Sequence, residues 1–249
     1  MKINSNLKIA LYILFISMLS NSCTKKSDNH IGPTVGKLIS TIQFSTGASS
    51  SYTYNANDQR STFVYKSGTI TEYASYTYTG SSMTMLANET SGTNSYVFKN
   101  IVQFNSTGLA ISEVDSTTGS STSGNTLYYS YDANGYRTSI TAPSYTENIT
   151  YQNGNMVTAI YSGAISSSYT YTYYMDKPNT LGNQNFGIYF IGKDNANLRK
   201  SYTYTNGINT TTYNYTYDFN ADGTVQKQTI TMTPSTGSPT TTWQTYTYQ

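Results

Sequence analysis

Residues 201–219 read SYTYTNGINTTTYNYTYDF, and here tyrosine alternates with threonine, serine or asparagine. Successive side chains on a β-strand point to opposite faces of a sheet, so Tyr202 and Tyr204 share one face. Tyr213, Tyr215 and Tyr217 share one face for the same reason. Because tyrosine and threonine both favour a pleated surface, the stretch predicts two strands, 201–205 and 210–219.

The same period of two recurs along most of the chain. It predicts further strands at 37–45, 61–66, 69–79, 96–104, 126–131, 156–161, 167–174, 225–233 and 241–249. No segment shows a sustained apolar stripe with the 3.6-residue period of a helix. All-β domains often run past roughly 200 residues as one unit, so we expect a single all-β domain over residues 35–249.

The chain has 27 tyrosines, and they allow two interpretations. Each tyrosine joins a large apolar ring to a polar tip. The rows can form the core, because Ile, Leu and Val are too few to fill one alone. Alternatively, some rows form an exposed stacking platform for sugars, and the binding residues would then be Tyr169, Tyr171, Tyr173, Tyr213, Tyr215 and Tyr217.

Three turns share the pattern Asx-x-x-Gly, namely Asn105 to Gly108, Asp132 to Gly135 and Asn220 to Gly223. The pattern predicts type I turns that close bulged hairpins, with the glycine at positive φ. Asn153-Gly154 marks another hairpin. We therefore expect a strongly twisted antiparallel meander curled into an open barrel or roll, since a flat sheet would leave its edges unprotected.

Two of these turns carry a family resemblance. Tyr129-Ser-Tyr131-Asp132-Ala-Asn-Gly135 and Tyr215-Thr-Tyr217-Asp218-Phe-Asn-Ala-Asp-Gly223 resemble the Y-x-Y-D-x-x-G unit of YD (Rhs-type) repeats. Asp176-Lys-Pro178-Asn179 and Lys193-Asp-Asn195 are similar to a region of uncharacterised YD-like lipoproteins of diderm bacteria. The resemblance implies a β-hairpin architecture and no particular activity. The repeats are few and irregular, so we expect no large encapsulating shell.

Two stretches interrupt the strand pattern. Residues 115–125 are rich in Ser, Thr and Gly and predict a flexible loop. Residues 176–199 form a longer irregular insert with one proline and three glycines. Long inserts in compact domains are usually functional or structural plugs. We expect a plug over one end of the sheet, with a binding loop as the alternative.

The N-terminus predicts export. Lys2 and Lys8 precede an apolar run at 9–19, which is far shorter than the roughly 20 residues of a bilayer-spanning helix. Leu19-Ser-Asn-Ser-Cys23 resembles a bacterial lipobox, in which the cysteine takes a diacylglycerol. We expect a signal peptide at 1–22, lipidation of Cys23 and a flexible tether through residue 34. An ordinary secretory signal or an uncleaved anchor is the alternative.

Thr24 follows the lipidated cysteine, whereas an Asp at this position would be the usual signal for inner-membrane retention. The expectation is therefore a lipid-anchored protein of the outer membrane, on its periplasmic or its surface side. Without Lys2 and Lys8, twelve basic residues balance twelve acidic ones. No basic stripe is visible, so we expect no nucleic-acid partner.

Two short motifs suggest further sites. Asp218, Asn220 and Asp222, followed by Gly223, match the opening of a calcium loop, but position twelve is Thr229 rather than Glu. We favour a hairpin turn over a metal site. Asp115-Ser116-Thr117 resembles a short O-glycosylation signal centred on Ser116, although chance explains so short a match.

Catalytic groups are scarce. Cys23 is the only cysteine and His30, in the tether, the only histidine, so a Cys-ligated metal site or a nucleophile–histidine pair is not expected. Glu113 and Asp115 share a strand face, as a glycosidase pair could, but we interpret them as solvated loop-edge charges. We expect a non-enzymatic envelope lipoprotein without cofactor that binds a glycan or a protein partner. A purely structural lipoprotein is the alternative, and a hydrolase is a third class.

Overall fold

The computed structural model describes residues 36–115, 126–164 and 166–249. Sixteen strands follow one another along the chain: β1 (Ile39–Phe44), β2 (Ser49–Tyr54), β3 (Arg60–Ser67), β4 (Ile70–Tyr78), β5 (Ser82–Ser91), β6 (Asn94–Phe104), β7 (Ala110–Asp115), β8 (Thr126–Tyr131), β9 (Arg137–Ala142), β10 (Tyr145–Gln152), β11 (Asn155–Gly163), β12 (Ser167–Pro178), β13 (Asn197–Asn206), β14 (Asn209–Phe219), β15 (Val225–Pro234) and β16 (Thr240–Tyr248).

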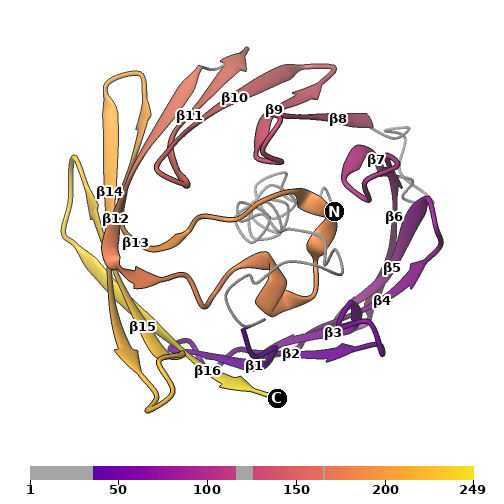
Figure 1. Cartoon of the computed structure of the whole chain (residues 1–249). Coiled ribbons are helices and arrows are strands. Elements are labelled where there is room, and N and C mark those ends of the chain that lie inside the picture. Colours follow the sequence, from indigo (N-terminus) through magenta and orange to yellow (C-terminus); the bar gives the residue numbers. More distant parts are fainter. Residues whose placement is uncertain (1–35, 116–125, 165) are drawn as a thin grey trace.

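The strands form a closed barrel (Figure 1). Each strand pairs antiparallel with the next, and β1 also pairs antiparallel with β16, from Ile39 opposite Tyr248 to Phe44 opposite Gln244. The predicted antiparallel meander, curled into a barrel, is confirmed. Closure leaves no unpaired sheet edge, which removes the risk of edge-to-edge association.

Five strands lie outside the predicted ranges, namely β2, β5, β7, β9 and β10, although the predicted hairpins at 105–108 and 132–135 implied strands at the positions of β7 and β9. Strand β5, SMTMLANETS, alternates Met and Ala with polar residues and so lacks the aromatic signal. Its inward side chains Met83, Met85 and Ala87 are nonetheless buried. The period of two is present in β5, but its inward residues are Met, Ala and Glu rather than aromatic residues, which makes the pattern weak.

The two faces of the barrel wall differ in chemistry. On the outer face, hydroxyl groups pair across neighbouring strands, as in Thr53–Thr62 (2.7 Å), Thr172–Ser201 (2.7 Å) and Thr203–Thr212 (3.2 Å). On the inner face, tyrosines and apolar residues pack together, and the largest buried cluster includes Tyr52, Phe63, Tyr76, Val102 and Tyr246. On these strands threonine therefore faces out and tyrosine faces in, whereas Tyr73 of β4 and Tyr128 of β8 are exposed on the outer face.

The three predicted Asx turns are confirmed. The amide of the glycine donates to the carbonyl of the Asx residue at 3.0 Å in all three, and the φ angles of Gly108, Gly135 and Gly223 are 82°, 84° and 83°. Because hairpins alternate between the two ends, all three turns lie at the end of the barrel where β12 stops and β13 begins.

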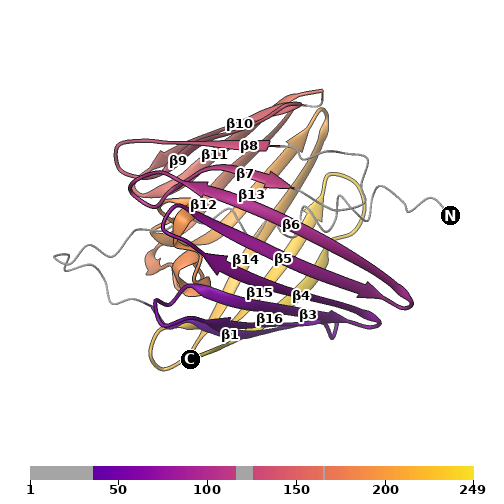
Figure 2. The same cartoon turned by 90° about the vertical axis from the view of Figure 1, so that its right-hand side faces the viewer.

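Residues 179–196, between β12 and β13, form the insert, and they turn back into the barrel (Figures 1 and 2). The insert contains two short 3₁₀ helices, η1 (Asn183–Phe186) and η2 (Tyr189–Ile191). The flanks of the predicted irregular stretch, 176–178 and 197–199, belong instead to β12 and β13.

Hydrogen bonds tie the insert to several hairpins around the ring. The amide of Arg60 in β3 donates to the carbonyl of Gly187 at 3.0 Å, and the amide of Lys193 donates to Gly135 at 2.7 Å. The amide of Ala196 donates to Gly154 at 2.9 Å. The amide of Val225 donates to the Thr180 hydroxyl at 3.2 Å. The insert therefore plugs this end of the barrel, as predicted.

Gly187 is required where the insert meets the wall. Its φ of +65° is left-handed, and a Cβ there would lie 2.6 Å from both the Arg60 amide nitrogen and the Asp58 carbonyl oxygen. Other residue types avoid this backbone conformation and would also collide with β3.

Candidate binding site in the barrel interior

A continuous group of tyrosine rings covers the inner face of β11 to β14. We call it the tyrosine wall, and it comprises Tyr161, Tyr169, Tyr171, Tyr202, Tyr204, Tyr213 and Tyr215. Neighbouring ring centroids lie between 4.4 Å (Tyr202–Tyr213) and 6.2 Å (Tyr169–Tyr171) apart. These are ordinary distances for favourable aromatic pairs.

The six tyrosines named as candidate binding residues all belong to inward rows. Tyr215 is 9% exposed, as expected for core, whereas Tyr169, Tyr171, Tyr173, Tyr213 and Tyr217 are half-buried. A barrel of sixteen strands encloses more space than its own side chains can fill, which explains the residual exposure. The rows thus line the interior, and none forms a platform on the outside. Burial also raises the pKa of Tyr169 and of Tyr173 to about 12, so both stay neutral at neutral pH.

Three arginines project into the interior beside the insert. Arg60 and Arg137 are the first residues of β3 and β9, and Arg199 is near the start of β13. Each guanidinium lies over a tyrosine ring, with Arg60 4.9 Å from the Tyr52 centroid and Arg137 5.7 Å from Tyr129. Arg199 lies 4.9 Å from the Tyr171 centroid and 5.6 Å from Tyr202. Aromatic faces attract such cations.

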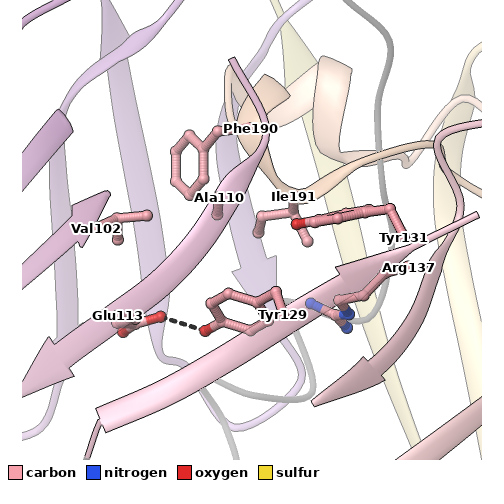
Figure 3. A pocket seen from close by; sticks show the side chains of 8 residues that line it. All are labelled: Val102, Ala110, Glu113, Tyr129, Tyr131, Arg137, Phe190 and Ile191. Carbon is pink, nitrogen blue, oxygen red and sulfur yellow. Dashed lines mark hydrogen bonds between the residues drawn. The ribbon is translucent and has the colours of Figure 1, made fainter. Parts of the chain in front are cut away.

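One small cavity, of about 20 Å³, lies between the insert and the wall near β7 to β9 (Figure 3). Phe190 and Ile191 of the insert line it together with Arg137 and Glu113. The Tyr129 hydroxyl donates to Glu113 at 2.6 Å, and the Asn100 amide donates to the same carboxylate at 2.7 Å. Burial raises the pKa of Glu113. This cavity contains charges of both signs.

The interpretation of Glu113 as a solvated loop-edge charge is wrong. Glu113 points into the barrel, because the inward face of β7 continues to the end of the strand. Asp115 shares that face and further raises the pKa of Glu113. The charged neighbour on the cavity wall is Arg137 rather than a second carboxylate.

A second cavity, of about 60 Å³, lies at the foot of the tyrosine wall. Its lining is polar apart from two leucines, and it comprises Tyr173, Asn179, Leu181, Asn195, Asn197, Leu198, Arg199, Tyr215, Tyr217 and Gln228. The insert fixes it in place, since the Tyr173 hydroxyl donates to the Asn195 side chain at 3.0 Å and the Asn179 amide to the Asn195 carbonyl at 3.1 Å. Arg199 supplies the single charge on this lining.

Two carboxylates face each other elsewhere on the inner wall. Glu72 of β4 pairs directly with Glu89 of β5, and each is 8% exposed. Burial and then the neighbouring charge of Glu89 raise the pKa of Glu72 to about 7. Burial also raises the pKa of Glu89.

The residues proposed for calcium serve the turn instead. Asp222 accepts hydrogen bonds from the amide and hydroxyl of Thr224 at 3.0 and 2.6 Å, and Lys37 donates to its second oxygen at 2.7 Å. The side chain of Asn220 donates to Thr224 at 2.9 Å, and Asp218 lies exposed on β14 opposite Lys227. The hairpin turn is confirmed. Among the described residues no group of three or more His, Cys, Asp or Glu could hold a metal ion.

Three residues singled out in the sequence, Cys23, His30 and Ser116, lie outside the described residues. Within the described part, no helix is both long enough and apolar enough to cross a bilayer.

The inward arginines were missed, although the sequence holds a signal for two of them. Tyr52-Thr-Tyr54-Asn55 is followed by Arg60 just as Tyr129-Ser-Tyr131-Asp132 is followed by Arg137. In both hairpins the Asx side chain caps the turn, and the arginine returns over the preceding tyrosines. A Tyr-x-Tyr-Asx unit closed by arginine thus places a cation inside. Arg199 follows the insert and has no such motif.

Comparison with known proteins gives a likeness of fold. No protein-family model matches the chain, and no curated protein matches it. A porin-like protein from Bacteroides uniformis has a crystal structure that superposes with a TM-score of 0.61 at 17% identity, covering 86% of this chain and 98% of that one. A porin-like protein from Bacteroides vulgatus gives a TM-score of 0.40 at 10% identity over 86% of this chain and 99% of that one. The first likeness supports the barrel fold.

Proposed function

We propose that this chain is a non-enzymatic cell-envelope lipoprotein, anchored to the outer membrane through Cys23, whose barrel interior binds a glycan. The tyrosine wall is the observation that carries the proposal. It presents a row of half-buried aromatic rings, on which sugar rings can stack, inside a barrel plugged at one end. Tyrosine suits such a site because its ring is apolar and its hydroxyl forms hydrogen bonds.

The outward side chains of the strands from β12 round to β2 support anchoring through a lipid rather than insertion of the barrel into the membrane. A barrel that spans a membrane shows lipids an apolar band and keeps polar residues inside. Here the strands from β12 round to β2 present hydroxyl pairs outward and tyrosines inward. The porin-like description of the Bacteroides uniformis protein agrees with an envelope setting, but a pore-forming role would need the opposite polarity.

The tether supports an orientation for the anchored protein. Lys37 lies next to the insert, since its carbonyl accepts a hydrogen bond from the Asn185 side chain at 3.0 Å. The chain that leads back to Cys23 therefore joins the barrel at its plugged end.

The YD-like resemblance is part of the proposal. Two hairpins, 52–60 and 129–137, repeat the same turn and place the same arginine over tyrosine. This similarity supports descent of the wall from repeated hairpin units.

A purely structural role is the second candidate. The two cavities beside the insert are small, at about 20 and 60 Å³, and the tyrosine rows contribute to the buried clusters. In that case the tyrosines only fill and stiffen the barrel.

Binding of soluble oligosaccharides to the purified domain distinguishes the two roles. For an oligosaccharide that binds the parent, Tyr202→Ala should weaken binding by roughly 10-fold, a common effect of losing one aromatic contact at a hot spot. Tyr73→Ala is the control, because Tyr73 is 44% exposed and lies on the outer face. If no oligosaccharide binds, the structural role is favoured. If both variants bind like the parent, the glycan binds elsewhere than on the tyrosine wall.

The lipid anchor needs its own experiment. Cys23→Ala should move the full-length protein from the membrane fraction to the soluble fraction on cell fractionation. A variant that stays in the membrane fraction contradicts anchoring through Cys23.

A further inference from the structure

The cavity at the foot of the tyrosine wall has a net positive character. None of its lining residues is a carboxylate, and Arg199 is the charged group among them. The groups that act on the Arg199 charge are the hydroxyls of Tyr215, Tyr173, Tyr171 and Tyr217. Burial raises the pKa of all four, so these hydroxyls are neutral at neutral pH. A guanidinium is thus held here without a carboxylate on the cavity wall.

The other two arginines are compensated in ways that Arg199 is not. Arg137 lies near Glu147, which is the first group to act on its charge, and Glu113 lines the same cavity. The Nε atom of Arg60 donates to the Phe186 carbonyl of the insert at 3.0 Å. The Tyr173 and Tyr215 hydroxyls form hydrogen bonds with the Arg199 side chain, but its Nε atom is buried and has no hydrogen-bond partner among the described residues. Leaving a buried charged donor unsatisfied is costly, and a carboxylate is the group that a guanidinium binds best.

The position of Arg199 relative to the tyrosine wall indicates the kind of ligand. Tyr173, Tyr171 and Tyr169 follow one another on β12, and their partners on β13 are Arg199, Tyr202 and Tyr204 in the same order. The Arg199 cation therefore lies at the plugged end of the tyrosine wall. The pairs Tyr171–Tyr202 and Tyr169–Tyr204 follow it along the strands, over roughly 13 Å towards the other end of the barrel. Sugar rings stacked on these two tyrosine pairs would place the carboxylate of the ring nearest the plugged end beside Arg199.

We propose that the barrel interior recognises acidic glycans, with Arg199 binding the carboxylate of a uronic acid whose neighbouring sugar rings stack on the tyrosine wall. This inference rests on the proposed glycan-binding function and names its substrate class. The Asn179, Asn197 and Gln228 side chains line the same cavity as Arg199, and they suit the ring hydroxyls of the same sugar.

The test compares two tetrasaccharides that differ in the acidic group alone, galacturonate tetrasaccharide and its carboxyl-reduced counterpart, galactose tetrasaccharide. Isothermal titration calorimetry of the purified residue 24–249 chain should show the acidic form binding roughly 10- to 100-fold more tightly, the range of a charge-assisted hydrogen bond. Arg199→Gln should remove this preference, so that the variant binds the two tetrasaccharides with similar affinity. Arg199→Lys should keep part of the preference, because it keeps the charge without the bidentate geometry.

The outcomes separate this inference from the glycan proposal. Equal affinity of the parent for both tetrasaccharides overturns the role of Arg199 and leaves glycan binding standing. If the parent binds neither tetrasaccharide, both this inference and the glycan-binding proposal are overturned. If Arg199→Gln fails to fold by circular dichroism, Arg199→Lys decides: a reduced preference for the acidic form with intact binding of the neutral form supports the role of Arg199, and an unchanged preference contradicts it. A peptide with an acidic C-terminus that binds more tightly than the uronate also overturns the inference, in favour of a protein ligand.

Discussion

The inner and outer faces of the same strands behave as two different surfaces. On β14, Tyr213, Tyr215 and Tyr217 point inward, while Thr212, Asn214 and Thr216 between them point outward. Because successive side chains point to opposite faces, one short segment contributes to both surfaces. On the strands from β12 round to β2 the inward surface is aromatic and the outward one is hydroxylic, which is the reverse of a barrel that spans a membrane. On β4 to β6 the outward face also exposes Tyr73, Leu86 and Val97. The comparison shows that a likeness of fold does not settle which solvent the wall meets.

Truncation of neighbouring residues on β14 is the strongest test of this comparison. Tyr215→Ala removes a buried ring that contacts Tyr202 and Arg199, so it should lower the free energy of unfolding by roughly 3–5 kcal/mol. Thr216→Ala removes an exposed side chain and should change it by less than about 0.5 kcal/mol. Chemical denaturation measures both. Similar losses for the two variants would contradict the assignment of faces.

A substitution at the contact between the insert and the inner wall should lower the free energy of unfolding nearly as much. Gly187→Ala forces a left-handed alanine against the backbone of β3, so it should cost roughly 2–4 kcal/mol. Gly207→Ala is the matched control. Gly207 has a φ of +57° but no atom within 4 Å of an added Cβ, so the strain alone should cost about 1 kcal/mol. Thermal unfolding of the two variants should separate them, and equal shifts would indicate that the insert packs loosely.

The carboxylates of the inner face predict a dependence of stability on pH. The pKa of Glu72 is raised in the folded state from 4.5 to about 7, so the folded form binds a proton that the unfolded form releases. Stability should fall as pH rises from about 4.5 to 7 and level off above it. Glu72→Gln should make this fall shallower and stabilise the protein by about 1–3 kcal/mol at pH 8, with little effect at pH 4, while Glu89 and Glu113, whose pKa values are also raised, keep part of the fall. The outward neighbour variant Thr71→Ala should leave the pH profile of the parent unchanged, and a Glu72→Gln profile as steep as that of the parent would refute the burial of this carboxyl.

The smallest expected effect concerns the turns. Gly223→Val at a φ of +83° should cost about 1–2 kcal/mol, although the space around it is open. Gly80 also has open space but an ordinary φ, so Gly80→Val should cost less. The melting temperatures of both variants should be measured together. A larger drop for Gly223→Val than for Gly80→Val would show that the left-handed φ accounts for the cost, and equal drops would contradict this.

Much of the fold was predictable because alternation and turn chemistry are local. The rows Tyr202/Tyr204 and Tyr213/Tyr215/Tyr217 gave the strands of one wall, and Asn220 to Gly223 gave its turn. Full closure was not predictable, because the pairing of β1 with β16 depends on the number and tilt of all strands rather than on any local signal.

The interior site was less accessible to sequence reasoning. Arg199 and Tyr171 are 28 positions apart by number and meet only because β12 and β13 are adjacent across the insert. Glu113 looked like an end-of-strand charge, since nothing local shows that Asn100 and Tyr129 meet it inside the barrel. Burial of a charged group depends on partners from other strands, and these are fixed by topology.

The pairing of β1 with β16 also bears on how the protein reaches its native state. Ser40 and Thr247, whose hydroxyls lie 2.9 Å apart across this seam, are 207 positions apart in the chain. Hairpins along the wall can form as soon as they are synthesised, but the seam must wait until the last strand has emerged. Until then, both β1 and the growing edge offer unpaired backbone groups. An exported chain of this kind would therefore complete its folding only after translocation ends, and the interval before closure is when it most needs protection from aggregation.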